Sequence, residues 1–170
     1  MSVVACKVTD KEIVVAADSI LVRGYTQEKD RNKQSKLFKV NDMIIGSAGY
    51  AEESSLLRIY AKTRKPRSAT EEDILTFMTE FAQWMSDRSE SSSIQNTYII
   101  IYDKKVFYMN GYYIKDIHTY EAIGAGEEIA LGVLYMGHSA EDAVKAACEL
   151  CIYCEEPIVT YRVSKKENRK

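Results

Sequence analysis

The stretch that decides the fold is residues 2–19, SVVACKVTDKEIVVAADS. It contains two short apolar runs, 3–8 and 12–17, on either side of the polar turn Thr9-Asp10-Lys11. Two such runs around a tight polar turn predict a β-hairpin. The second run is apolar almost throughout, as in a strand covered on both faces, and it ends at Asp18-Ser19. The chain is therefore expected to open with a buried hairpin.

The remaining sequence alternates runs of strands with pairs of helices. Apolar runs between turn residues predict further strands over 35–40, 43–48, 97–102, 106–109, 112–114 and 157–163. Apolar residues at helical spacing predict helices over 51–63, 71–84, 127–136 and 139–153. Residues 24–34 are polar and are expected to form a loop.

This order of elements predicts an α+β fold. Strands in antiparallel runs and helices in pairs disfavour a parallel βαβ sheet. The arrangement that buries every apolar face is a four-layer αββα sandwich, with two antiparallel sheets face to face and a helix pair outside each. The chain has 170 residues, 46% of them hydrophobic and 28% charged, which suits one compact domain. We expect this domain to span 1–163 and a charged tail to span 164–170.

Composition excludes several classes of function. The chain has 23 basic and 25 acidic residues and a formal net charge of −2, so it lacks the basic face of a nucleic-acid-binding protein. No apolar run reaches the roughly 18 residues that span a membrane, and no signal peptide opens the sequence. The four cysteines are then expected to be reduced thiols in the cytoplasm.

An ordered set of motifs resembles the proteasome β-subunit family of N-terminal-nucleophile (Ntn) hydrolases. The opening stretch resembles the start of a mature β subunit, whose first residue is the nucleophile. KLFKV at 36–40 resembles the strand with the catalytic lysine, and IIGSAG at 44–49 resembles the segment that supplies an oxyanion N–H. AIGAG at 122–126 resembles the family's Gly-Ser-Gly turn, and ELCIY at 149–153 resembles the HslV branch. The resemblance covers nearly the whole chain.

The resemblance implies a peptidase in which Ser2 becomes the nucleophile once Met1 is removed. A serine hydroxyl needs an adjacent base, and the α-amine of the same residue, with a reference pKa of ~7.7–8.0, can serve. The Ntn arrangement is one variant of the catalytic triad. Lys36 would favour the neutral amine and the developing alkoxide through its charge, and Asp18 would orient Lys36.

Two glycines compete for the role of oxyanion donor, because either Gly46 or Gly49 aligns with the family segment. The sequence departs from the family in two places. Ala125 stands where the family has the serine of Gly-Ser-Gly, and the nucleophile is serine where most members have threonine.

Three cysteines, Cys148, Cys151 and Cys154, stand three residues apart. A zinc site would need a fourth ligand from elsewhere, and buried helix thiols are the simpler interpretation. The resemblance implies a different ion at these positions, sodium, held partly by main-chain oxygens.

No cofactor is required for the implied peptide hydrolysis. The resemblance implies a protein or peptide substrate and a homo-oligomeric ring, hexameric or heptameric and in some members stacked. HslV-like enzymes work with an ATP-dependent unfoldase ring. Two alternatives stay open: a catalytically silent ring subunit of the same fold, and an Ntn amidase acting on a small amide.

Overall fold

A computed structural model describes residues 2–29, 36–89 and 93–165. The predicted opening hairpin is confirmed as β1 (Val4–Val8) and β2 (Glu12–Ala17), which pair antiparallel with Val4 opposite Ala17. The Thr9 hydroxyl closes the turn by accepting the N–H groups of Lys11 and Glu12. Local turn chemistry thus sets the register of the strand pair that carries the start of the chain.

The hairpin lies at the centre of a four-stranded antiparallel sheet of order β10-β1-β2-β11. Its outer strands are β10 (Tyr120–Ile123), beside β1, and β11 (Val159–Ser164), beside β2. Neighbouring strands therefore pair with both edges of the hairpin.

The second sheet has five antiparallel strands in sequence order. They are β5 (Leu37–Val40), β6 (Met43–Ala48), β7 (Thr97–Tyr102), β8 (Lys105–Asn110) and β9 (Tyr113–Ile117). Asn41-Asp42 and Asp103-Lys104 form two-residue turns with positive φ at both positions, which is the geometry of tight hairpins. Each pair contains Asn or Asp, the residue types that favour such turns.

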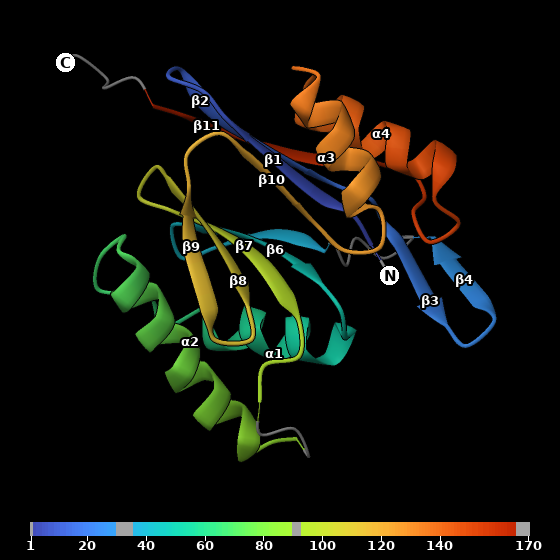
Figure 1. The fold of residues 1–170 in the computed structure, drawn as a ribbon. Helices are drawn as coiled ribbons and strands as arrows, with labels where there is room; N and C mark the ends of the chain where they lie inside the picture. Colours follow the sequence, from blue (N-terminus) through green and yellow to red (C-terminus); the bar gives the residue numbers. More distant parts are fainter. Residues whose placement is uncertain (1, 30–35, 90–92, 166–170) are drawn as a thin grey trace.

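Helix pairs cover the outer faces of both sheets, which gives the predicted four-layer αββα sandwich (Figure 1). Helices α1 (Ala51–Tyr60) and α2 (Glu71–Ser86) pack on the five-stranded sheet. Helices α3 (Glu127–Tyr135) and α4 (Ala140–Leu150) pack on the four-stranded sheet. Thr70 and Ser139 begin α2 and α4 with side-chain caps, as their sequence positions suggest.

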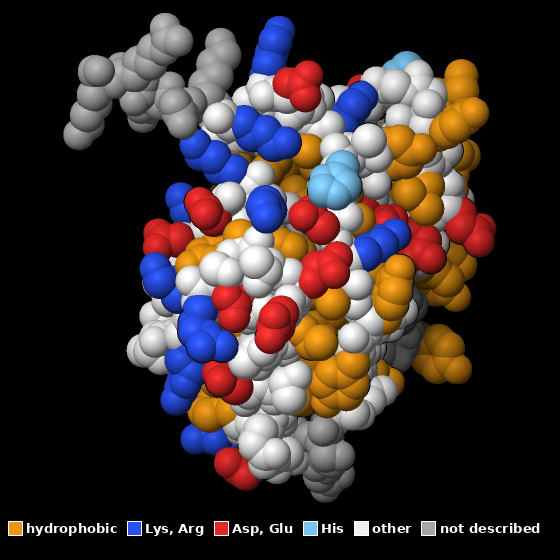
Figure 2. Space-filling view, turned by 60° about the vertical axis from the view of Figure 1, so that its left-hand side comes forward, with side chains coloured by type: hydrophobic (Ala, Val, Ile, Leu, Met, Phe, Trp, Pro, Cys, Tyr) orange, Lys and Arg blue, Asp and Glu red, His pale blue; other side chains and the backbone are white. Residues whose placement is uncertain are grey.

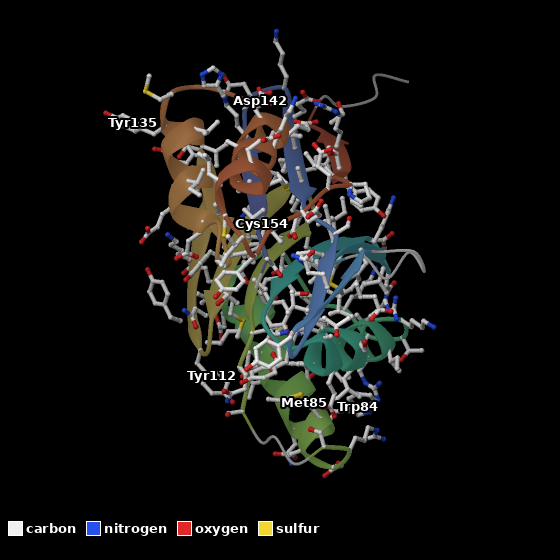
Figure 3. The ribbon with its side chains drawn as sticks, turned by 90° about the vertical axis from the view of Figure 1, so that its right-hand side faces the viewer. Trp84, Met85, Tyr112, Tyr135, Asp142 and Cys154 are labelled. Carbon is white, nitrogen blue, oxygen red and sulfur yellow. The ribbon has the colours of Figure 1, made fainter. Side chains whose placement is uncertain are left out.

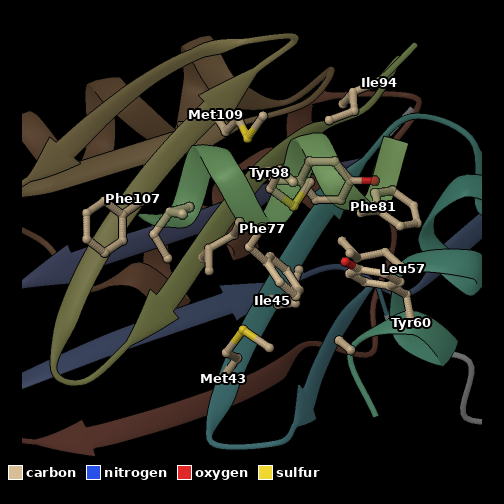
Figure 4. Close-up of a cluster of buried hydrophobic side chains, with 14 of the residues drawn as sticks. Met43, Ile45, Leu57, Tyr60, Phe77, Phe81, Ile94, Tyr98, Phe107 and Met109 are labelled. Atoms are coloured by element: carbon tan, nitrogen blue, oxygen red, sulfur yellow. The ribbon is translucent and has the colours of Figure 1, made fainter. Parts of the chain in front are cut away.

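Three hydrophobic cores fill the spaces between the four layers. The first joins α1 and α2 to the five-stranded sheet and contains the buried phenylalanine and tyrosine side chains of the described residues (Figure 4). The second lies between the sheets and is rich in valine and isoleucine. The third, under α3 and α4, is built largely of alanine, so these helices approach their sheet closely.

The structure corrects the sequence prediction at several elements. Residues 24–34 are predicted to form a polar loop, but part of this range forms β4 (Thr26–Lys29), which pairs with β3 (Ile20–Arg23) in a separate hairpin. This hairpin pairs only with itself, so β4 lacks the apolar alternation that marks a strand. Residues 30–34 of the predicted loop lie outside the described residues. Strand β10 was not predicted. Helix α4 ends at Leu150 instead of residue 153, because Cys151 adopts an extended conformation.

Strand β11 includes Ser164, the first residue of the predicted tail, and 166–170 lie outside the described residues. Basic and acidic side chains are mixed over the face that Figure 2 draws. Among the described residues, none of the helices has the length and apolarity that crossing a membrane requires.

Candidate active site

Asp18 connects the start of the chain to Lys36. It follows β2 directly and is fully buried. Its Oδ1 accepts the Val3 N–H at 2.8 Å, and its Oδ2 accepts the Lys36 ammonium at 2.7 Å. The Asp18 N–H in turn donates to the Val3 carbonyl at 3.2 Å. The structure therefore brings together three residues that the sequence singled out, Ser2, Asp18 and Lys36.

Ser2 is held from the opposite side by the turn before α3. Its side chain and backbone are only 2% exposed, and its carbonyl accepts the Gly126 N–H at 3.2 Å. Gly124 has a φ of +97°, and a Cβ there would overlap the Ser2 carbonyl oxygen. Glycine at 124 thus permits a close approach of the turn to residue 2.

Residues that the sequence did not point to also donate hydrogen bonds to Asp18. Its Oδ2 also accepts the N–H groups of Ile20 at 3.3 Å and Glu155 at 3.4 Å. Ser19 donates its N–H to the Glu155 carbonyl and its hydroxyl to the Pro157 carbonyl. These contacts use mainly backbone groups of the segment after α4. A pattern of side chains in the sequence therefore could not predict them.

Lys36 is a partly buried cation beside the Asp18 carboxylate. It precedes β5, and its side chain is 14% exposed. Burial lowers the pKa of Lys36 below its ordinary value, while the charge of Asp18 and their hydrogen bond oppose that shift. Its backbone carbonyl accepts the Ser47 N–H at 2.9 Å, which ties the lysine to the end of β6.

The two glycine candidates for the oxyanion donor differ in their surroundings. Gly46 lies inside β6, between β5 and β7, and a Cβ there would be 2.7 Å from Val4 Cγ1 on the facing sheet. Gly49 lies beyond the end of β6 with a φ of +141°. Within the described ranges, the Gly49 N–H donates no intramolecular hydrogen bond. The geometry therefore gives Gly46 a packing role and leaves the Gly49 N–H available to a ligand.

The cysteines pack behind the start of the chain. Cys154 is buried, and a Cβ at Gly126 would be 2.8 Å from its Sγ, so the thiol packs against the turn that holds Ser2. Burial, with a further contribution from the charge of Asp18, raises the pKa of Cys148 to about 12 and raises that of Cys154 as well. These thiols are protonated at neutral pH.

The sodium prediction remains untested by this geometry. In the part of the chain that the structure describes, no group of three or more His, Cys, Asp or Glu side chains is placed to hold a metal ion. Sodium is a hard cation and would use carbonyl oxygens, one of which, on Cys151, already accepts the Cys154 N–H at 3.0 Å.

Position 125 lacks the hydroxyl that the family motif would place there. The Ala125 carbonyl accepts a weak hydrogen bond from the Cys151 thiol, at 3.6 Å. The backbone of the Gly124–Ala125–Gly126 turn is thus fixed from the α4 side, whereas the side chain at 125 has nothing to donate.

Comparison with known proteins identifies the fold. Neither the models of known protein families nor the curated proteins match this sequence. Among solved structures, Thiobacillus denitrificans BPH in complex with epoxomicin has a TM-score of 0.88 at 18% identity, covering 97% of this chain and 100% of that chain. A second Thiobacillus denitrificans BPH structure has a TM-score of 0.86 at 19% identity, over 95% and 97%.

A third similar structure is eukaryotic HslV from Trypanosoma brucei, with a TM-score of 0.71 at 17% identity, over 95% of this chain and 99% of that one. Likeness at such low identity establishes the fold and leaves the chemistry to be argued from the site. The chain therefore has the proteasome-like Ntn hydrolase fold that HslV also has.

Proposed function

We propose that the chain is an Ntn peptidase that hydrolyses peptide bonds with Ser2 as its nucleophile. One observation carries the proposal: the Asp18 carboxylate joins the Lys36 ammonium to the peptide that follows Ser2. Removing the Asp18 carboxylate and the Lys36 ammonium from water destabilises the fold unless the two charges are paired. Their pairing beside Ser2 therefore needs an explanation, and catalysis supplies one.

The reaction requires the α-amine of Ser2, and therefore the removal of Met1. The Ser2 Oγ attacks the carbonyl carbon of the scissile bond while its proton passes to that amine. The resulting oxyanion accepts the Gly49 N–H. The C–N bond then breaks as the amine returns the proton to the leaving nitrogen. Water, deprotonated by the same amine, hydrolyses the ester left on Ser2 and restores the hydroxyl.

Lys36 acts in this scheme through its charge. A cation beside the α-amine lowers the pKa of that amine, so that the amine is a free base near neutral pH. The same charge stabilises the alkoxide that develops on Ser2. Asp18 keeps the ammonium oriented, and the Gly49 N–H supplies an electrostatic term that, for a single oxyanion donor, is worth ~2.7–4 kcal/mol.

The proposal is tested with peptide hydrolysis by protein whose mass shows Ser2 as the first residue. Ser2→Ala and Lys36→Ala are each expected to reduce kcat by at least about a hundredfold, because the first removes the nucleophile and the second removes the charge that stabilises the free amine and the developing alkoxide. The matched control is Lys39→Ala, which removes an exposed lysine three residues further along, in β5, and should leave kcat unchanged.

A peptide bearing an electrophilic group offers a second measurement. Mass spectrometry should locate one adduct on Ser2 in the wild type and none in Ser2→Ala. Hydrolysis that persists in Ser2→Ala would refute the assignment of the nucleophile. Cleavage of small amides but not of peptides would favour the amidase alternative.

A specific observation also favours a second candidate, a catalytically silent subunit of the same fold. Ala125 offers no hydroxyl to the α-amine. Protein that begins at Ser2, is folded, and yet gives neither hydrolysis nor an adduct would support the silent subunit. Restoration of activity by Ala125→Ser would then identify the missing group.

The same proposal includes a homo-oligomer, in which the chain would form a hexameric or heptameric ring, single or stacked. Large apolar side chains lie exposed at the ends of α3 and α4: Tyr135, Met136, Leu150 and Ile152. Tyr135 projects outward from the end of α3 (Figure 3). An apolar surface of this kind is a candidate for contact with further copies. An ATP-dependent unfoldase would be a further partner, detectable as ATP-stimulated cleavage of a folded protein.

A further inference from the structure

The turn that carries Gly49 is fastened by a side chain from a distant part of the sequence, that of Asn96. Asn96 is fully buried and immediately precedes β7. Its Oδ1 accepts the Tyr50 N–H at 2.5 Å, and its Nδ2 donates to the Tyr50 carbonyl at 2.9 Å. One side-chain amide thus replaces a pair of ladder hydrogen bonds at the point where β6 ends.

Gly49 is packed directly against this amide. A Cβ at position 49 would overlap Asn96 Oδ1 and would be 2.7 Å from Asn96 Cγ. The Tyr50 N–H is already donated to Asn96, so it is not available to a substrate. The Gly49 N–H is the neighbouring donor. Its direction depends on the next peptide, between Gly49 and Tyr50, whose N–H is held by Asn96.

The segment around Asn96 is held in turn by Glu53, a buried carboxylate on α1. Glu53 Oε1 accepts the Asn96 N–H at 3.1 Å and the Tyr98 hydroxyl at 2.7 Å, and Oε2 accepts the Gln95 N–H at 2.9 Å. Burial and the charge of Glu53 raise the pKa of Tyr98 well above its ordinary value, so the phenol remains a donor. A fully satisfied buried network of this kind fixes geometry.

The network continues to the lysine. Asn96 Nδ2 also donates to the Ser54 hydroxyl at 3.0 Å, and the Ser54 and Ser47 hydroxyl oxygens are 2.8 Å apart. Ser47 donates its N–H to the Lys36 carbonyl. Asn96 is therefore connected both to the Gly49 turn and to the backbone of Lys36, although it lies far from either in sequence.

We propose that Asn96 is a positioning residue that aims the Gly49 N–H at the oxyanion. The inference rests on the proposed peptidase function and extends it to a residue that makes no contact with substrate. The Gly49 turn lies at the surface, where the exposed Tyr50 side chain offers it no packing support. Without Asn96 the turn would therefore sample several orientations, and only one of them places the N–H correctly.

The test is Asn96→Ala, assayed for kcat and KM separately. We expect kcat to fall by roughly ten- to a hundredfold, the range expected for a misplaced catalytic group, with KM unchanged. A peptide aldehyde, which forms a hemiacetal with a hydroxyl nucleophile, should lose affinity by a similar factor. The corresponding peptide alcohol, which forms no tetrahedral adduct, should bind as before. Asn96→Asp keeps the acceptor for the Tyr50 N–H and should recover part of kcat.

Tyr98→Phe is the matched control. It removes the Tyr98 hydroxyl, and with it the hydrogen bond to Glu53, from the same buried network but keeps both hydrogen bonds between the Asn96 side chain and Tyr50. It should lower the melting temperature and leave kcat unchanged, which separates stability from positioning. If Asn96→Ala and Asn96→Asp keep full kcat in an active enzyme, the inference is overturned. A wild type without hydrolysis or adduct would instead overturn the proposed function, and this inference with it.

Discussion

At the scale of single residues, Asp18 shows how a buried charge is kept in place. Its two carboxylate oxygens together accept hydrogen bonds from Val3, Ile20, Lys36 and Glu155. Three of these donors are backbone N–H groups and one is a cation. A buried carboxylate with this many donors is compensated for the loss of water.

The pH dependence of activity tests the pairing of Asp18 with Lys36. Burial lowers the pKa of Lys36, and Asp18 raises it. Asp18→Asn removes the raising contribution, so the lysine should lose its charge at a lower pH than in the wild type. We expect the alkaline limb of the kcat/KM profile to move to lower pH, because the reaction needs the ammonium form.

The comparison for this experiment is Asp42→Asn. Asp42 also pairs with a lysine, Lys65, at 3.3 Å, but both side chains are well exposed. An exposed pair contributes little, so the alkaline limb should stay in place in this variant. An Asp18→Asn profile with an unmoved or upward-shifted limb would contradict the role given to Asp18.

At the scale of elements, the distance between the two sheets depends on one glycine. Gly46 on β6 faces Val4 on β1, and there is no room for a methyl group between them. Because the strands are held on both sides, the sheets cannot separate locally to admit one. The glycine therefore sets how closely the hairpin that begins with Ser2 approaches β6.

Gly46→Ala should accordingly destabilise the fold. Overpacking of a well-filled core costs ~1–3 kcal/mol, and we expect a loss in this range in the free energy of unfolding measured with urea. Gly132→Ala is the matched substitution in α3, where a Cβ meets nothing within 4 Å. It should stabilise by ~0.4–1 kcal/mol. Equal effects of the two substitutions would show that Gly46 has no packing role.

At the scale of the whole molecule, the exposed apolar side chains at the ends of α3 and α4 predict self-association. Analytical ultracentrifugation of the wild type should show a species several times heavier than the 19.3 kDa chain. Leu150→Lys combined with Ile152→Lys should lower that mass, because burial of two lysines in a contact is unfavourable.

Ile59→Lys is the comparison for the oligomer. Ile59 is 52% exposed on α1, in the opposite helix layer from Leu150 and Ile152. Loss of the assembly in Ile59→Lys alone would move the contact to the other face of the molecule. A wild type that sediments as a single chain would exclude the ring.

The layers and most residues of the candidate site can be predicted from local sequence patterns and the family resemblance. Apolar periodicity predicts the two sheets and four helices, because each element must bury one face. The opening hairpin, the turn pairs and the positions of Ser2, Asp18 and Lys36 all follow from local patterns or from the family resemblance. The hairpin of β3 and β4 could not be found in this way, because it lies apart from the two main sheets and its strands need no apolar pattern.

The contacts that hold the site, in contrast, are visible only in the folded chain. Gly49 is preferred to Gly46 as the oxyanion donor because its N–H lacks a hydrogen-bond partner within the described residues. Whether an N–H has a partner depends on the folded backbone. Asn96, Glu53 and Glu155 belong to segments far from Ser2 in sequence, and they act through hydrogen bonds that form when the layers assemble. Such contacts leave no local periodicity, because a hydrogen bond needs two groups in one place and imposes no spacing along the chain.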